Sequence, residues 1–327
     1  MSVFLNSIIV IIAVALAIYV NYPPLPPSPI LYQWESTGRR FKFNNFIIFY
    51  KVELGNGTGN VVCLHGFPTS SYDWYKIFPY LKQKFKWIIA LDFLGFGYSD
   101  KPRFHSYSIF EQADIVQEML SFEKIKDVHI LAHDYGDTVA QELLYRDQNQ
   151  LLPFKINSVC LLNGGIFPDK YYPRLSQKVL MLPIIGTITA KLISFPFVRV
   201  GLCELFGPNT QPHSEELHNF WSIMQYQEGY RAWGSILNYI QERNDNEERW
   251  VSAIQKATVP VYMIYGPADP VNPPPFAEHY RKVIPKPRIT VLPNHIGHYV
   301  QLEAPEEMIE NYFNFIYNLA NNNSTQL

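Results

Sequence analysis

The chain has 327 residues, of which 47% are hydrophobic and 17% charged, and its formal net charge is -2. This length and composition predict one large or two moderate globular domains, and the near-neutral charge without a basic tract argues against nucleic acid as a partner. The three cysteines, at positions 63, 160 and 203, fit neither a disulfide framework nor a zinc site. We therefore expect no metal, and because Gly95 and Gly97 are not part of a full G-x-G-x-x-G fingerprint, we expect no cofactor.

The N-terminal segment differs in character from the rest of the chain. Residues 3–20 carry no charge and are nearly all apolar, which is about the minimum for a helix that crosses a bilayer. Residues 23–34 include the run PPLPPSP and predict a stiff, extended, proline-rich linker. Alanines in the apolar run also allow a cleaved signal peptide, but no basic residue precedes it. We expect a retained membrane anchor at residues 1–22.

The side of the membrane on which the body lies is left open by two opposing signals. Arg39 and Arg40 are the first basic residues, and they follow the apolar run, which favours a cytoplasmic body. The triplets that begin at Asn56, Asn322 and Asn323 are potential glycosylation acceptors, which would require a lumenal body. Both orientations are kept as alternatives.

Beyond the anchor, strand-like and helix-like stretches alternate. Short runs rich in Val, Ile and Leu predict strands at 46–54, 60–66, 86–92, 127–133, 156–163, 259–265 and 288–292. Helical spacing of apolar residues is found at 108–122 and again at 138–147. This alternation is typical of an α/β protein with a mostly parallel sheet covered by helices on both faces.

The strand rhythm stops in the middle of the chain, which defines the predicted domains. Helical, aromatic-rich sequence replaces it. We therefore predict a helical cap inserted into an α/β core. The predicted boundaries are 35–165 for the first part of the core, 166–256 for the cap and 257–320 for the second part. Residues 321–327, NNNSTQL, are expected to be a disordered tail.

Three loops carry unusual side chains at places where parallel strands end. AHDYGD holds Asp134, YGPADPV holds Asp269, and HIGHYVQLEAP holds His298. Ligands and reactive groups in such sheets gather beyond the carboxyl ends of the strands. The order of nucleophile, acid and histidine is that of the nucleophile-elbow enzymes. Taken alone, Asp134 and Asp269 could each be ordinary turn residues.

Together, HGFPTSSYDW, LDFLGFGYSDKP and HDYGD resemble the α/β-hydrolases, in the branch of epoxide hydrolases and haloalkane dehalogenases. The resemblance implies an α/β-hydrolase fold over about residues 35–320. It also implies that Asp134 is the nucleophile, Asp269 the acid and His298 the base. The backbone N–H groups of Phe67 and Tyr135 would form the oxyanion hole. In the loop that carries Phe67, the residues His65, Gly66 and Pro68 are expected to support the oxyanion hole.

The residue types suit covalent catalysis. An aspartate is already ionised at neutral pH and can attack a saturated carbon directly, whereas a serine must first lose a proton. The product would be an ester on Asp134. His298, oriented by Asp269, would then activate water to hydrolyse that ester.

The anchor together with HGFPTSSYDWYKI and NGGIFP also resembles the mesoderm-specific transcript family of animals. That resemblance implies a membrane-associated hydrolase of the endoplasmic reticulum, held by a single N-terminal anchor. The high aromatic content of the cap suits an apolar pocket. We therefore expect the partners to be a membrane and a small apolar or lipid-like substrate.

Two departures from the relatives narrow the expected reaction. Phe67 and Tyr135 stand where haloalkane dehalogenases hold the halide with Asn and Trp, so dehalogenation is disfavoured. Ile240 stands where epoxide hydrolases place an acidic tyrosine, and the neighbouring Tyr239 is expected to point elsewhere. The candidate donors in the cap are Tyr171, Tyr172, Tyr226, Tyr230 and Tyr239.

Three functions are compatible with this pattern. The preferred one is an epoxide-hydrolase-like enzyme that acts on an apolar substrate. The second is a lipid acyl hydrolase or acyltransferase, which would require Asp134 to form a labile mixed anhydride. The third is a non-catalytic ligand-binding or signalling protein, against which the complete set of Asp134, Asp269 and His298 argues.

Overall fold

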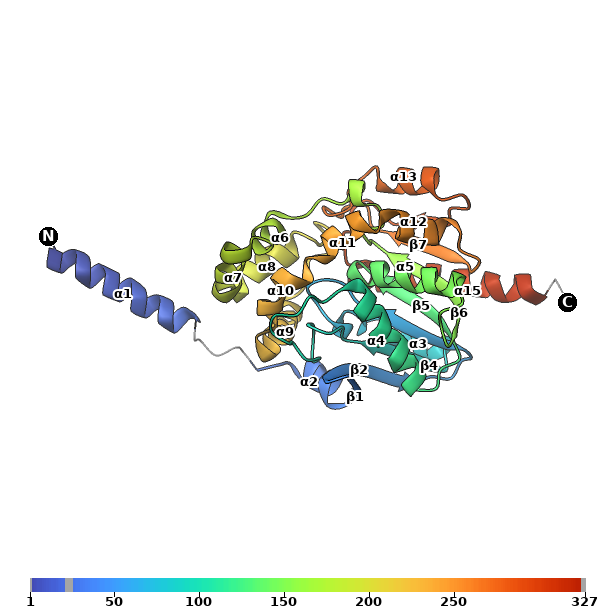
Figure 1. Cartoon of the computed structure of the whole chain (residues 1–327), viewed down its shortest axis with the longest axis horizontal. Coiled ribbons are helices and arrows are strands. Elements are labelled where there is room, and N and C mark those ends of the chain that lie inside the picture. Colours follow the sequence, from blue (N-terminus) through green and yellow to red (C-terminus); the bar gives the residue numbers. More distant parts are fainter. Residues whose placement is uncertain (1, 21–25, 325–327) are drawn as a thin grey trace.

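The computed structural model describes residues 2–20 and 26–324, and within them a single sheet forms the centre of the body (Figure 1). The sheet has eight strands in the order β1-β2-β4-β3-β5-β6-β7-β8. Their bounds are β1 Arg39–Phe43, β2 Phe46–Leu54, β3 Asn60–Leu64, β4 Trp87–Leu91, β5 Asp127–His133, β6 Lys155–Leu162, β7 Val261–Tyr265 and β8 Ile289–Val291. β2 runs antiparallel to β1 and β4, and all other neighbours are parallel.

The central strands are buried because both faces of the sheet are covered. The residues of β3, β4 and β5 are mostly Val, Ile, Leu and Ala with almost no exposure, as expected for parallel strands between two helical layers. One layer contains α4 (Ile109–Phe122), α5 (Tyr135–Gln148) and α12 (Glu247–Gln255), and the other α3 (Phe78–Lys84) and α15 (Pro305–Ser324). The predicted α/β class with a mostly parallel sheet is confirmed. β1 was not predicted, because RRFKF is short and half charged.

Between β6 and β7 the described chain contains helices and loops but no strand. Besides α12, the α-helices of this stretch are α6 Leu175–Leu180, α7 Pro183–Leu192, α8 Phe195–Cys203, α9 Ser214–Gln225, α10 Trp233–Ile236 and α11 Tyr239–Asp245. Figure 1 shows α6 to α10 gathered at one end of the sheet. α12 lies within the predicted cap boundary but packs along α5, because Trp250 and Arg249 both donate hydrogen bonds to the buried Glu142.

Near the N-terminus, α1 (Ser2–Val20) is an exposed apolar helix that extends from the body on the side of the cap (Figure 1). Among the described residues no single helix is both long and apolar enough to span a membrane. Phe4–Ala15 is a shorter apolar helix, and α7 with α8 reach that length only together, across a bend of 107°.

The predicted linker at 23–34 is corrected in its second half. Residues 23–25 lie outside the described residues, but Pro29–Ser36 form helix α2. Ser28 caps it by accepting a hydrogen bond from the N–H of Leu31, and proline at the first helical position is already in a helical conformation. Leu31 and Trp34 are buried in the body, so α2 is an integral part of the core. At the other end, α15 continues to Ser324, into the expected tail, and residues 325–327 lie outside the described range.

We expect Leu31→Ala to destabilise the body, because Leu31 has no exposed surface and its truncation leaves a cavity. The cost should be about 2–5 kcal/mol of unfolding free energy, measured by urea unfolding. Ile30→Ala is the matched control, since the neighbouring Ile30 is 51% exposed, and it should change stability by less than about 0.5 kcal/mol. Equal effects of the two substitutions would show that α2 is not anchored in the core.

Candidate active site

Asp134 occupies a sharp turn between β5 and α5. Its backbone has φ 49° and ψ -106°, a left-handed conformation that costs energy for a residue with a side chain. The turn is crowded: a Cβ atom on Gly136 would lie 2.2 Å from the carbonyl oxygen of Leu64, and one on Gly66 would lie 2.9 Å from the Cβ of Asp134. Glycine is therefore required at both positions. The turn holds the Asp134 carboxylate, which is 3% exposed, at the carboxyl end of the central strand.

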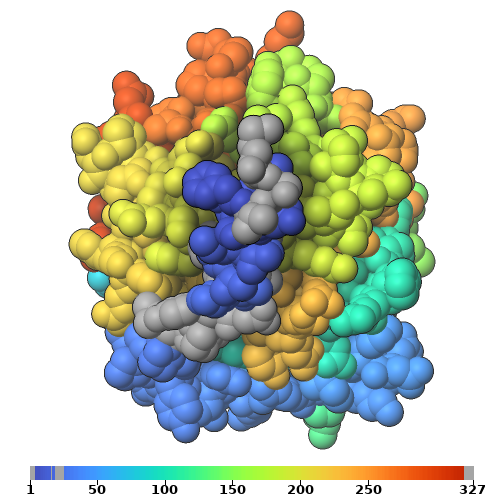
Figure 2. Space-filling model, turned by 90° about the vertical axis from the view of Figure 1, so that its left-hand side faces the viewer, coloured from blue at the N-terminus to red at the C-terminus, as the bar shows by residue number. Residues whose placement is uncertain are grey.

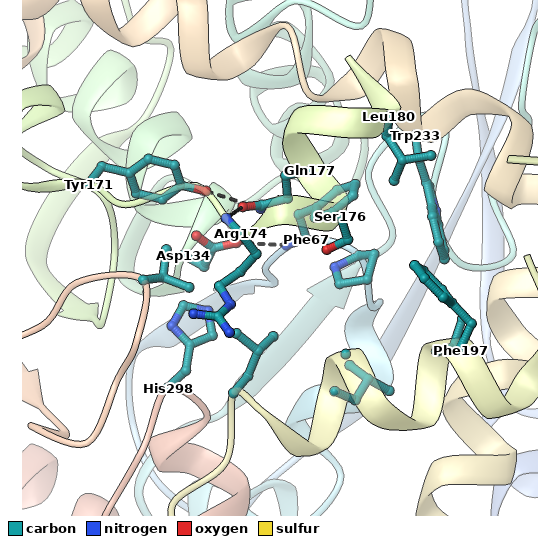
Figure 3. Close-up of a pocket in the computed structure, with 16 residues that line it drawn as sticks. Phe67, Asp134, Tyr171, Arg174, Ser176, Gln177, Leu180, Phe197, Trp233 and His298 are labelled. Carbon is teal, nitrogen blue, oxygen red and sulfur yellow. Dashed lines mark hydrogen bonds between the residues drawn. The ribbon is translucent and has the colours of Figure 1, made fainter. Parts of the chain in front are cut away.

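One oxygen of this carboxylate is held by the backbone. The N–H of Phe67 donates a hydrogen bond of 2.9 Å to Oδ2 of Asp134 (Figure 3). Tyr135 is the first residue of α5, where backbone N–H groups have no partner within the helix. Its use as the second oxyanion donor stays a prediction.

His65 supports the loop that carries Phe67. Its Nδ1 donates to the carbonyl of Gly66 at 2.8 Å, and its Nε2 accepts from the N–H of Phe93 at 3.1 Å. These two bonds require the neutral ring, and burial lowers its pKa in agreement. Pro68, the next residue in the loop, lines the pocket in front of Asp134.

His298 and Asp269 form a buried pair next to Asp134. Nδ1 of His298 lies 2.8 Å from Oδ2 of Asp269, whose other oxygen accepts from the N–H of Val271 at 2.7 Å. The amides of Asn163 and Asn272 also donate to Asp269, at 2.9 and 3.0 Å. Neither asparagine was predicted, although Asn163 begins the NGGIFP motif and Asn272 directly follows the YGPADPV loop.

Charge dominates burial in setting the protonation of this pair. Burial alone would lower the pKa of His298, but Asp269, followed by Asp134 and Glu303, raises it to about 9. Burial alone would raise the pKa of Asp269, but His298 and the two asparagine amides hold it below its usual value. At neutral pH the resting site therefore contains a protonated His298 between carboxylates.

The loop of His298 is fixed from two sides. Glu303 accepts hydrogen bonds from the N–H groups of Gly297 and Tyr299, at 2.8 and 2.9 Å. His133, the residue before the turn, lies with Nε2 3.0 Å from the carbonyl oxygen of His298. Burial and the charge of His298 lower the pKa of His133, so its ring is neutral and positions the loop.

A buried arginine that the sequence analysis missed lies on the opposite side of Asp134. Arg243 is 2% exposed, its Nε donates to Oγ1 of Thr138 at 2.8 Å, and its Nη2 lies 3.9 Å from Oδ1 of Asp134. The guanidinium is placed between the rings of Tyr171 and Tyr239, at 4.8 and 4.5 Å from their centroids. It thus places a second positive charge, in addition to that of His298, beside the buried Asp134 carboxylate. In the sequence, Arg243 has no feature that distinguishes it from an arginine on the exposed face of a helix.

The structure separates the five candidate tyrosines. Tyr171 lines the pocket, and its hydroxyl lies 2.9 Å from that of Tyr239, which is fully buried. Tyr172 is exposed, and Tyr226 and Tyr230 pack against other aromatic rings outside the pocket lining.

The expectation that Tyr239 points elsewhere was wrong. It assumed one continuous helix, whereas the chain breaks after α10, and α11 starts afresh at Tyr239. The hydroxyl of Tyr239 is thereby turned toward Tyr171.

The pocket above Asp134 is mainly apolar. Leu180, Phe197, Val198, Leu202 and Trp233 line it from the cap. Figure 3 shows Asp134 and His298 at one side, Phe197, Trp233 and Leu180 at the other, and the Tyr171 hydroxyl next to Gln177. The arrangement can hold an apolar molecule with one reactive carbon near a carboxylate and one oxygen near a hydroxyl.

His298 should make the stability of the protein depend on pH. Because its folded-state pKa is raised from 6.5 to about 9, its contribution is complete below the unfolded value and is lost as the pH rises through the folded one. The stability advantage of the wild type over His298→Gln should therefore shrink by on the order of 3 kcal/mol between about pH 6 and 10. Urea unfolding of both proteins across this range measures it. A constant difference would show that His298 is not held in its charged form.

Comparisons with known proteins identify the family and the fold. Residues 59–305 match the family model described as alpha/beta hydrolase fold. The mesoderm-specific transcript protein of Mus musculus is 46% identical over 308 residues, covering 92% of each chain. The solved structure of the epoxide hydrolase CorEH has a TM-score of 0.71 at 22% identity, covering 86% of this chain and 99% of the other.

Haloalkane dehalogenase DbeA from Bradyrhizobium elkani superimposes with a TM-score of 0.73 at 20% identity, covering 86% of this chain and 98% of the other. Similarity at this level establishes the fold, whereas the substrate has to be inferred from the residues of the site. By the family match and the 46% relative, this chain belongs to the α/β-hydrolase fold family.

Proposed function

We propose that this hydrolase opens epoxides of apolar, lipid-like substrates through an ester on Asp134. One observation carries the proposal: Asp134 lies at the turn with Oδ2 held by the N–H of Phe67, while the hydroxyl of Tyr171 lines the same pocket. This shared pocket supports the roles proposed for Asp134 as nucleophile and for Tyr171 as proton donor. A serine hydrolase would need a base for its first step, but an ionised carboxylate does not.

In the first step, Oδ1 of Asp134 attacks a ring carbon, and the bond from that carbon to the epoxide oxygen breaks. The released oxygen takes the hydroxyl proton of Tyr171. Tyr171 can offer that proton to the pocket, because its oxygen is able to accept hydrogen bonds from Gln177 and from Tyr239. Burial and the charge of Asp134 raise the pKa of Tyr171 to about 12. This is still well below the pKa of the alcohol that forms when the released oxygen takes the proton, so the transfer is favourable.

Before the second step, protonated His298 passes its proton to the Tyr171 phenolate. Neutral His298 then removes a proton from water, and the resulting hydroxide attacks the carbonyl carbon of the ester. The negative charge that develops on Oδ2 is stabilised by the N–H groups of Phe67 and Tyr135. Collapse releases the diol and regenerates the Asp134 carboxylate. The second proton of the water passes to the departing substrate oxygen, and His298 stays protonated as in the resting site, so the net reaction is addition of one water molecule to the epoxide.

The proposed setting is a membrane, with α1 as a single N-terminal anchor and the endoplasmic reticulum as the location. The charge-free sequence of α1 and its position away from the body support this. An apolar pocket suits a substrate that partitions into lipid. Lipid acyl hydrolysis or acyl transfer is the second candidate, since the same pocket would accept an acyl chain, and the same experiment separates the two.

The mechanism predicts different outcomes for the three charged residues when protein is mixed with long-chain epoxides and followed by intact-mass spectrometry. Asp134→Ala should form no adduct. His298→Gln should react once and accumulate protein heavier by one substrate. Asp269→Asn should form the ester normally but hydrolyse it roughly 10²–10⁴-fold more slowly.

Parallel panels of esters and haloalkanes serve as controls for the reaction class. An adduct from esters alone would favour acyl transfer over epoxide opening. If His298→Gln forms no adduct with any member of these panels, the covalent aspartate mechanism is refuted.

Tyr171→Phe should slow ester formation about 10²-fold or more in single-turnover mass spectrometry, because the departing oxygen loses its proton donor. The aromatic ring beside Arg243 is retained in this variant, so the packing is preserved. Tyr172→Phe is the matched control, since Tyr172 is 56% exposed, and it should react at the wild-type rate. Equal rates for the two variants would assign the proton to another group.

A further inference from the structure

The outer face of the cap carries a dense patch of exposed apolar side chains, which we call the cap face. Its members are Leu175, Met181, Leu182, Ile184, Ile185, Ile188, Leu192, Phe197 and Val200. They belong to α6, α7, α8 and the short connection between α6 and α7. Ile184 is 75% exposed and Leu175 77%. Scattered exposed apolar residues are ordinary, but a contiguous apolar surface of this density marks a binding face.

The unpaired charges on the cap face are positive. Residues 170–203 contain five basic residues and no acidic one, and Asp169 and Glu204 at the two borders of this stretch pair with Lys170 and Arg174. Lys178, Lys191 and Arg199 are exposed, and none of them forms a salt bridge with any residue that the structure describes. Apolar side chains ringed by unpaired lysine and arginine are the pattern of segments that lie in the surface of a membrane rich in anionic lipid.

The cap face and the active-site pocket are two sides of the same wall. Val198 and Leu202 of α8 are buried and line the pocket, while Val200 of the same helix points outward and is 61% exposed. Phe197 does both, since it lines the pocket and is 48% exposed. The pocket therefore opens next to the cap face. Figure 2 shows α1 projecting from this side of the molecule, with the surface of α6 to α8 on both sides of it.

We propose that the cap face docks onto an anionic lipid bilayer and that substrate enters the pocket from the lipid, past Phe197. The partner is a membrane surface, because the face combines aliphatic side chains with the unpaired positive charges of Lys178, Lys191 and Arg199, and because the apolar helix α1 emerges on the same side. The proposal deepens the proposed function only in placing the body against the bilayer, and it is independent of the chemistry at Asp134.

The docking is tested with environment-sensitive fluorophores on single cysteines in the full-length protein, with Cys203→Ser removing the one native thiol that is not buried. Ile185→Cys reports the cap face, Ile11→Cys reports α1, and Leu151→Cys reports the opposite end of the body. All three native side chains are exposed, which favours folding of each variant. The protein is reconstituted into phosphatidylcholine–phosphatidylserine vesicles that contain a quencher attached to the lipid chains.

Quenching at positions 185 and 11 but not at 151 is the expected result. Quenching at 11 alone would overturn the docking of the cap face while the anchor stands. Quenching at 185 alone would support the docking and refute the anchor, so the two proposals fail separately. Equal quenching at 185 and 151 would also overturn the docking, because it would show no preferred orientation.

The charge component has its own test with matched variants. Combined Lys178→Gln, Lys191→Gln and Arg199→Gln should reduce quenching at position 185 by about half or more, as should omission of phosphatidylserine. Lys126→Gln, an exposed lysine beside β5 and away from the cap, should leave it unchanged. Quenching that is indifferent to all of these changes would refute an anionic lipid surface as the partner.

Discussion

The left-handed backbone of Asp134 is the constraint on which the rest of the site depends. A carboxylate at a turn with positive φ projects away from both β5 and α5, so it can be approached from the pocket. The same turn forces close contact with the loop of Gly66, which brings the N–H of Phe67 to the carboxylate. The parallel sheet then delivers Asp269 and His298 to the same edge, from the ends of later strands.

The sequence was informative where local pattern and sheet topology agree. Buried runs of Val, Ile and Leu predicted the central strands, and the loops after them contained the residues that the structure brings together at Asp134. Prediction failed where position depends on distant packing. Tyr239 turned inward because the helix restarts there, and α12 joined the core through Glu142. Arg243 is held by two rings and a threonine that lie far from it in the chain.

The two sides of the cap have different proposed roles: the inner side binds the substrate and the outer side contacts the membrane. In α8 the residues that face inward line the apolar pocket, and those that face outward form part of the apolar cap face with its basic side chains. A helix with apolar residues on both sides is uncommon at the surface of a globular protein. Here the pattern is consistent with a wall that has the sheet core behind it and lipid in front of it.

The charge coupling between Asp134 and His298 has a consequence for timing. The Asp134 carboxylate is one of the charges that hold the pKa of His298 at about 9. In the proposed mechanism, esterification removes that charge, so His298 releases its proton more readily once the nucleophile has reacted. In the resting enzyme His298 is protonated and cannot act as a base, and it becomes a base only after the substrate has reacted with Asp134. His298 therefore deprotonates water only when an ester is present on Asp134, and in the empty site it stays protonated.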